Sequence, residues 1–456
     1  MCNEGVCHRY TPCTSPGSVN MADSESPYNE RLQRLECQFT WNLERNDKLN
    51  IPDILQTLEV KIQHAAYRNA LIMYNVKAYL LHQLRRSTEA LSCLERSLEQ
   101  LRRDHQASAD HHFLTIYGNY AWIYYDLNNF HQVDVYLDKF QEISSRLSFD
   151  LSHSAHTFAE RGWSLLEVGI RNGYQAATLF KKALELYPDE NDFLAGLAFS
   201  TSSHAEYSED ADIRKEAIRL LDQLVMKCPH NWEAKACLAK MLQDTGHRKN
   251  LAKARKLMDD DFQECSNPEV LRIIAGLYRI IPFRKSLEIL ERAKHLAPDY
   301  HKLVQEIGHL YRHQIYHLID DGRLRAIEEA SKFYTAAIEL MPWNMSARMD
   351  LAEMYALQYK NDLEGIIYSM ISSVVESLSK DSKQRFYLQY GIYFLYKIHR
   401  PSSGIEILKK GFQIKPNSKF GVKCKKNLTY YILLDRTKEE EIDGFISELE
   451  DARRSK

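Results

Sequence analysis

The fold of this chain is decided by residues 117–145, YGNYAWIYYDLNNFHQVDVYLDKFQEISS. Apolar residues recur at helical spacing on both sides of Asn128 and Asn129: Tyr117, Tyr120, Ala121 and Tyr124, then Val133, Leu137 and Phe140. This pattern predicts two short amphipathic helices joined by a tight Asn-Asn turn. Neither helix can bury its apolar face alone, so the pair must pack against neighbouring pairs. Such a pair is the unit of an α-solenoid, and its spacing fits the tetratricopeptide repeat of about 34 residues.

The second helix of such a repeat has a regular order of side-chain sizes. A small residue is followed by a bulky one, then by a second small one, and proline ends the unit because it cannot extend the helix. This order returns at Ala176, Phe180, Ala183 and Pro188; at Ser286, Leu290, Ala293 and Pro298; at Ala330, Tyr334, Ala337 and Pro342; and at Gly404, Leu408, Gly411 and Pro416. A further segment keeps the phase with one small position lost: Ala217, Leu221, Leu224 and Pro229. The shared phase predicts an all-α tetratricopeptide-repeat superhelix rather than a generic helical bundle.

Composition limits the classes of function. The chain has 456 residues, 44% of them hydrophobic and 27% charged, and a formal net charge of −2. This balance gives no global cationic field, so a surface that binds nucleic acid must be local, and DNA is not an expected partner. Nine cysteines without a framework spacing are typical of reduced thiols in the cytosol. The chain lacks the apolar run of a membrane span or a signal peptide, so we expect a cytoplasmic protein without a membrane partner.

The pattern divides the chain into five parts. Residues 1–29 are polar and predict a disordered extension, in which Met21 is an alternative start. Three tetratricopeptide subdomains are expected at 30–150, 151–300 and 301–440, followed by a charged tail at 441–456. Within them we expect a loop at 202–212 that presents a ligand-facing edge, and one long helix from residue 301 to 321.

Nothing in the sequence predicts a catalytic centre. It has no Walker loop, serine elbow or HExxH, so we expect no enzyme, no catalytic residues, no cofactor and no metal. The spacing of His309, His313 and His317 suits a metal, but a polar helix face explains it better. Cys2, Cys7, His8 and Cys13 lack a second ligand pair. The block 409–426 has seven lysines and no acid, which leaves open a solvated face or a rim that contacts phosphates.

Four tracts together carry a family resemblance: LECQFTWNL at 35–43, YGNYAWIYYDLN at 117–128, RGWSLLEVG at 161–169 and FKKALELYPDEN at 180–191. They resemble the interferon-induced proteins with tetratricopeptide repeats, from about residue 31 to about residue 430. The resemblance implies a cytosolic antiviral effector, induced by interferon, whose superhelix encloses a basic channel. Such a channel holds single-stranded viral RNA by its 5′ end, often a triphosphate or an incompletely methylated cap. Some members act instead through protein partners, including other members of the family.

The resemblance also implies RNA-binding residues. Trp163 matches a family tryptophan that lies against the RNA 5′ end, where an indole can stack a base or cap. Asn231 and Arg272 match positions that contact RNA in the groove, and Arg279 follows Arg272 on the predicted helix. An arginine fork suits phosphate oxygens. Lys61, on the first groove helix, replaces a small polar residue of the family and adds a positive charge.

Other positions depart from the family pattern. Glu167 stands where the family has a phosphate-binding lysine, Ser203 stands where it has an arginine, and Gly173 stands where it has a tyrosine. A carboxylate beside a triphosphate is repulsive, so the preferred 5′ end stays open. The leading hypothesis is a non-enzymatic antiviral effector that binds single-stranded RNA. The alternative is an adaptor that binds other family members or host translation and antiviral proteins, and either form could be a homo-oligomer.

Overall fold

The computed structural model describes residues 27–43, 50–64, 70–104, 109–147, 154–208, 210–259, 262–277 and 281–454. Within these ranges the chain forms helices and no strand. The α-helices are α1 Pro27–Gln33, α2 Ile51–His64, α3 Ala70–Gln83, α4 Ser87–Asp104, α5 Ala109–Asp126, α6 Phe130–Leu147, α7 Ala155–Val168, α8 Gly173–Leu186, α9 Asn191–Tyr207, α10 Ala211–Lys227, α11 Trp232–Asp244, α12 Arg248–Asp259, α13 Pro268–Ala275, α14 Phe283–Leu296, α15 His301–Gln314, α16 Asp320–Leu340, α17 Met345–Leu357, α18 Asn361–Ser373, α19 Lys380–Tyr396, α20 Pro401–Ile414, α21 Lys419–Leu434 and α22 Glu439–Arg454. This all-α architecture confirms the predicted fold class.

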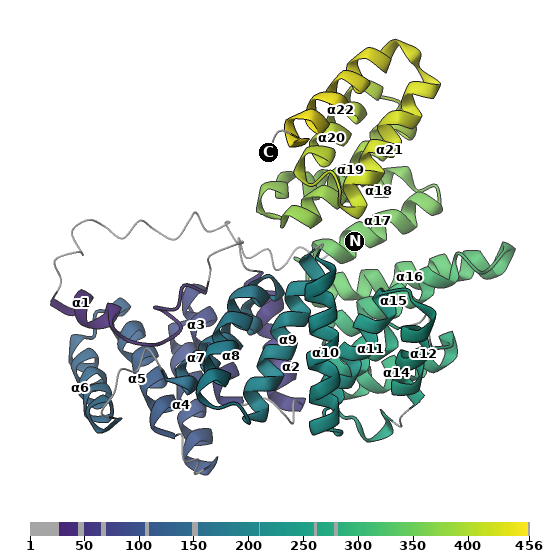
Figure 1. Cartoon of the computed structure of the whole chain (residues 1–456). Helices are drawn as coiled ribbons and strands as arrows, with labels where there is room; N and C mark the ends of the chain where they lie inside the picture. The colour runs from purple at the N-terminus through teal and green to yellow at the C-terminus, as the bar shows by residue number, and fades with distance from the viewer. Residues whose placement is uncertain are drawn as a thin grey trace, which may run out of the picture.

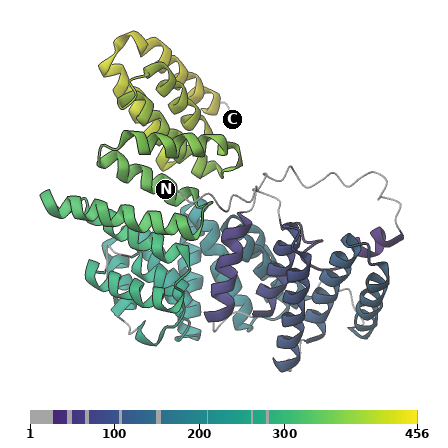
Figure 2. The same ribbon diagram turned by 180° about the vertical axis from the view of Figure 1, so that it is seen from behind.

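Successive helices pack as pairs, and the pairs stack side by side into a curved body (Figure 1). Helices α17–α22 form an arm that rises from one end of this body (Figures 1 and 2). Helix α2 departs from the stacking order, because it packs against α3, α7 and α13. Figure 1 shows α2 behind α8 and α9, and Figure 2 shows it in front. It therefore bridges helix pairs that are far apart in the sequence.

The predicted repeat positions occupy the second helix of each pair. Their side chains have almost no exposed surface; examples are Phe180 in α8, Leu290 in α14, Tyr334 in α16 and Leu408 in α20, each at 0% exposure. The repeat prolines 188, 229, 298, 342 and 416 each stand two residues beyond the end of their helix. These positions confirm the predicted register of small, bulky and small residues. Small residues at fixed intervals allow neighbouring helices to approach closely, and the bulky residue fills the space between them.

Glycines on neighbouring helices make room for the bulky residues. A β-carbon at Gly196 in α9 would lie 2.2 Å from Cε1 of Phe180, and one at Gly162 in α7 would lie 2.7 Å from Cε2 of the same ring. Tyr334 fills the space over Gly308 in the same way, with a 2.7 Å approach. One aromatic side chain thus locks two helices at a separation that a larger residue would prevent.

The stretch at 117–145 forms the predicted pair, α5 and α6, each of 18 residues. Asn128 turns the chain between them with φ of 57°, a left-handed conformation that asparagine tolerates. The aromatic face is a stack in which the rings of Tyr120 and Tyr136 lie 4.4 Å apart and nearly parallel. This pair is confirmed, including its turn.

Two expected features are wrong. Most of the loop expected at 202–212 is helical, because α9 continues to Tyr207 and α10 begins at Ala211. Ser202 and Ala205 are buried, and a β-carbon at Gly173 would collide with the α9 backbone at Ser200 and His204, so this segment is packed against α8. The long helix expected from 301 to 321 is two helices, because α15 ends at Gln314 and α16 begins at Asp320 with φ of 47°.

The ends of the chain are partly outside the described residues. Residues 1–26, with Met21 and the Cys2, Cys7, His8 and Cys13 group, lie outside them, while α1 begins at Pro27, within the expected extension. Helix α22 covers most of the expected charged tail and buries Ile442 and Ile446. None of the helices in the described ranges combines the length and apolar character that crossing a membrane requires.

Candidate nucleic-acid interface

Helix α2 carries a polar edge that contacts helices from two distant parts of the chain. Lys61 Nζ lies 2.6 Å from Oε2 of Glu167 on α7. At the other end, Gln56 Nε2 donates a hydrogen bond of 2.7 Å to the carbonyl oxygen of Asp299. Lys302 Nζ on α15 donates to Oγ1 of Thr57 at 2.9 Å. These contacts join residues up to 245 positions apart and hold α2 against the inner side of the body.

The pair of Lys61 and Glu167 is largely removed from solvent. The Glu167 side chain is 2% exposed and that of Lys61 is 17% exposed. An ion pair in such a place is retained only when both charges have partners, because removing one partner leaves an uncompensated buried charge. The carboxylate that departs from the family pattern is therefore neutralised inside this chain by the lysine that also departs from it.

Arg272 on α13 is held by two carboxylates. Its Nε and Nη2 donate to Oε2 and Oε1 of Glu269 at 2.9 and 2.8 Å, and Nη1 lies 3.5 Å from Oε2 of Glu306 on α15. Tyr300 also donates to Glu269, at 2.9 Å. Burial raises the pKa of Glu269, but the adjacent Arg272 guanidinium outweighs burial and holds that pKa well below its usual range. The guanidinium fork is already engaged in a bidentate bond.

Together these groups form what we call the inner charge cluster. Its members are the cations Lys61, Arg272 and Lys302 and the carboxylates Asp53, Glu167, Glu269 and Glu306. His301 joins it, since its Nε2 lies 3.2 Å from Oδ1 of Asp53. Four carboxylates face three permanent cations, so the cluster offers no unshared positive charge. A phosphate could bind here only by replacing a carboxylate as the partner of a cation.

Trp163 lies one helical turn before Glu167 on α7. Its side chain is only 5% exposed, and its ring packs edge-on against Phe180 at 5.0 Å between centroids. Its Nε1 donates to Oδ2 of Asp192 at 3.0 Å. The indole is thus next to the inner charge cluster but covered by aromatic neighbours, so stacking on a base would require Phe180 or Phe199 to move.

The remaining expected site residues have structural roles or lie outside the described residues. Asn231 is 5% exposed and caps the start of α11, because its side chain accepts a hydrogen bond from the Ala234 amide at 3.0 Å. Ser203 lies on α9, half-buried. Arg279 lies outside the described residues. The structure therefore brings Lys61 and Glu167 together and places Arg272 in the same cluster, whereas Asn231 has its own local function.

Sequence reasoning missed several members of the cluster. Asp53, Glu269, His301 and Lys302 carry no motif, and their partners are distant in the sequence. The signal that could have pointed to Glu269 is its position three residues before Arg272, a spacing at which opposite charges meet on one helix face.

A second buried network joins the body to the arm. Asp350 on α17 is 0% exposed and accepts hydrogen bonds from Gln305 at 3.1 Å and from His309 Nε2 at 3.0 Å, both on α15. Arg312 on α15 and Arg385 on α19 also pair with this carboxylate. The carboxylate of α17 thus has partners on two other helices, α15 and α19.

The three histidines at 309, 313 and 317 and the lysine block at 409–426 have different surroundings in the structure. His309 binds carboxylates, while the rings of His313 and His317 lie 4.8 Å apart. No group of three side chains in the described residues is arranged to hold a metal ion. In the lysine block, Lys409 and Lys425 pair with Glu441 and Glu450 of α22. The other five are exposed: Lys410, Lys415, Lys419, Lys423 and Lys426.

We expect the stability of the protein to fall between pH 6.5 and 9 because of His309. Burial lowers the pKa of His309, but hydrogen bonds to Asp350 and Glu306 raise it to about 9, above its ordinary value. The folded chain therefore holds this proton more tightly than the unfolded chain. The resulting stabilisation is complete below about pH 6.5 and is lost as the pH rises through 9. Because the His309 side chain is 30% exposed and solvent screens its interactions, we expect on the order of 1–2 kcal/mol rather than the roughly 3 kcal/mol of a fully buried group. Thermal unfolding followed by circular dichroism at pH 6.5, 8 and 9.5 measures it.

The matched variant for this pH dependence is His309→Gln, which keeps a hydrogen-bonding side chain but has no proton to lose. Its melting temperature should change less than that of the natural chain over the same pH range. Equal slopes for the two proteins would mean that His309 does not carry the effect.

The repeat register and the stacked helix pairs, with α2 packed across them, define a tetratricopeptide-repeat superhelix, a class of binding protein. The human protein "Interferon-induced protein with tetratricopeptide repeats 2" is 26% identical over 421 residues, which cover 89% of this chain and 87% of the relative. Human "Antiviral innate immune response effector IFIT1" is 28% identical over 352 residues, covering 72% and 71%. No family model matches the chain.

Solved structures of the same group of proteins are also similar to this chain. The structure described as "Human IFIT1 dimer with PPP-AAAA" has a TM-score of 0.75 and 25% identity, and covers 93% of this chain and 96% of its own. These similarities confirm the resemblance to the interferon-induced proteins with tetratricopeptide repeats, over most of the chain.

Proposed function

We propose that this protein is a non-enzymatic antiviral effector that acts in the cytoplasm by binding single-stranded RNA. The observation that carries the proposal is the structural similarity, over nine tenths of both chains, to human IFIT1 in a structure whose description includes PPP-AAAA. The name of the second relative as an antiviral innate immune response effector supports the same function. The adaptor alternative is not favoured, because the relatives' structures hold RNA ends.

The inner charge cluster is the proposed RNA contact, with Lys61 and Arg272 as its cations. Phosphate oxygens would replace the Glu167 and Glu269 carboxylates as partners of these side chains. Trp163, Asn231 and Arg279 are the further residues that the resemblance proposes for this contact. Because the contacts are mainly ionic, RNA binding should weaken steeply as salt increases.

A direct binding measurement tests this function. One single-stranded RNA sequence is prepared with a 5′-triphosphate, a cap or a 5′-hydroxyl, and fluorescence anisotropy is recorded at two salt concentrations with single-stranded DNA for comparison. The double variant Glu269→Gln/Arg272→Gln removes a charge pair while leaving neutral side chains of similar size. We expect it to bind RNA more weakly than the natural chain. Negligible binding of all three RNAs at low salt would end the proposal.

We also propose that the protein forms a homodimer through α21. Three large apolar side chains on this helix are highly exposed: Tyr430 at 53%, Leu433 at 72% and Leu434 at 59%. Exposed apolar clusters of this kind mark contact surfaces, and a second copy is the chosen occupant because the related human protein is described as a dimer.

Light scattering after size-exclusion chromatography tests the dimer. The natural chain should elute with twice the mass of the double variant Leu433→Glu/Leu434→Glu, since glutamate cannot be buried at an apolar contact. Gln413→Glu, at an exposed position of α20 rather than on the α21 face, is the control for added charge. Identical masses for the natural chain and the double variant would contradict the proposal.

A further inference from the structure

A pocket of about 420 Å³ lies between α2, α3 and α4, away from the inner charge cluster. Helix α2 uses opposite faces for the two sites. Asp53, Thr57 and Lys61 follow one another at intervals of four and face the cluster, while Leu55 and Glu59 are offset by two positions and line the pocket. The pocket therefore has its own set of residues.

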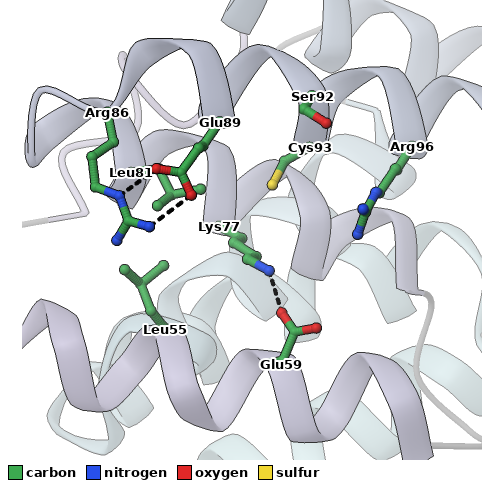
Figure 3. A pocket seen from close by; sticks show the side chains of 9 residues that line it. All are labelled: Leu55, Glu59, Lys77, Leu81, Arg86, Glu89, Ser92, Cys93 and Arg96. Carbon is green, nitrogen blue, oxygen red and sulfur yellow. Dashed lines mark hydrogen bonds and ion pairs between the residues drawn. The ribbon is translucent and has the colours of Figure 1, made fainter.

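The walls of the pocket carry charged side chains along their whole length, and two leucines lie toward one end. In Figure 3, α4 forms one side and α2 the other, with Lys77 of α3 between them. Leu55 and Leu81 lie toward the end that holds Arg86, and Arg96 lies at the opposite end, beyond Lys77 (Figure 3). A ligand with one apolar and one polar group would match this arrangement.

The charges of the pocket leave one cation without a carboxylate. Glu59 pairs with Lys77, and Glu89 forms a bidentate bond with Arg86, in which both N–O distances are 2.6 Å. Arg96 is exposed and has no hydrogen bond or ion pair with any residue that the structure describes. Lys77, only 16% exposed, has ammonium hydrogens beyond the one that Glu59 receives. The pocket can accept one further negative group, at the Arg96 end.

We propose that this pocket binds a peptide segment of a partner protein that carries one carboxylate close to an aliphatic side chain. The carboxylate lies against Arg96 and Lys77, and the aliphatic side chain lies on the half-buried Leu55, since Leu81 is only 3% exposed. A volume of about 420 Å³ is in the range of about 300–1,000 Å³ typical of ligand pockets. A trough between two helices accepts an extended chain.

The charges favour a peptide over RNA. An RNA strand brings a phosphate at every nucleotide, but Glu59 and Glu89 already occupy Lys77 and Arg86, so the pocket has only one cation without a carboxylate partner. A single carboxylate next to an aliphatic group matches that one cation. The Cys93 thiol lies among these charged groups, and burial raises its pKa, so it stays protonated and adds no charge to the pocket.

An array of acetylated and amidated heptapeptides tests the proposal with the full-length protein. Each peptide that pairs Asp or Glu with Leu, Ile or Val is matched by a version with Asn or Gln. The natural chain should retain acidic peptides and lose them when the acid becomes an amide. Arg96→Glu should weaken the best of them at least tenfold in fluorescence anisotropy, whereas Arg255→Glu, an exposed arginine of α12, should not.

Two results of the array would contradict the proposal. One is that the natural chain and Arg96→Glu retain the same peptides, and the other is that the natural chain retains no peptide whose binding depends on its Asp or Glu. A third contrary result is that Arg96→Glu weakens only a 5′-hydroxyl oligouridylate, which would assign the pocket to RNA. Circular dichroism confirms that the variants are folded.

Discussion

Replacement of Asp350 by alanine is expected to lower the free energy of unfolding of the region around α15, α17 and α19 by about 3–5 kcal/mol. The carboxylate is 0% exposed and is the shared partner of His309, Arg312 and Arg385. Without it, the remaining carboxylates are more distant: Glu353 lies 3.6 Å or more from the two guanidinium groups, and Glu306 lies 3.5 Å from His309. Like charges in a buried place repel strongly because little water screens them.

Hydrogen exchange followed by mass spectrometry locates this effect, because the arm and the body need not unfold together. Peptides from α15, α17 and α19 should lose protection in Asp350→Ala, whereas peptides from α5 and α6 should keep it. Asp350→Asn, which keeps the shape and one acceptor, should lie between. Asp443→Ala, an exposed acid of α22, is the matched control and should change stability by less than about 0.5 kcal/mol. A result for Asp350→Ala as small as the control would contradict the expected role of the network.

The repeat register could be predicted from the sequence because the close spacing of packed helices restricts the size of the side chain at regularly spaced positions. Phe180 sits over Gly162 and Gly196, and the same size pattern recurs wherever two helices of the superhelix approach. We expected a loop at 202–212, but Ser202 is buried and the α9 backbone at His204 packs closely against Gly173 of α8, so the polar composition of this segment was a poor guide. Small polar residues are compatible with a close helix contact as well as with a loop.

The candidate site was predictable only in part, for a different reason. Periodicity reports local geometry, and it placed Lys61 and Glu167 on helices without relating one to the other. Their contact depends on how α2 lies inside the curve of the body, which joins residues 106 positions apart. The same limit explains why the sequence predicted an RNA contact for Arg272 but not its contact with Glu306, which comes from the next helix pair.

Glu167→Gln is expected to strengthen binding of 5′-triphosphate single-stranded RNA by on the order of tenfold, or about 1.4 kcal/mol, at low salt. The substitution removes one of four carboxylates from the inner charge cluster and releases the Lys61 ammonium, 2.6 Å away, to bind phosphate. Two unit charges a few ångströms apart near a protein surface interact by a few kcal/mol, of which salt screens a part. One more phosphate contact should also steepen the dependence of the logarithm of affinity on the logarithm of salt by about 0.7.

The comparison of 5′ ends separates two origins of this gain. If Glu167 acts against the end of the RNA, the 5′-triphosphate form should gain more than the 5′-hydroxyl form, because only the former brings extra negative charge. If it acts against the backbone, the two should gain equally. The double variant Lys61→Gln/Glu167→Gln should lose the gain, since the cation is gone, and Glu216→Gln on the exposed face of α10 should show none. Unchanged affinity of Glu167→Gln for every RNA that the natural chain binds would mean that this ion pair lies apart from the path of the RNA, and the proposed contact would then have to rest on Arg272 and Lys302.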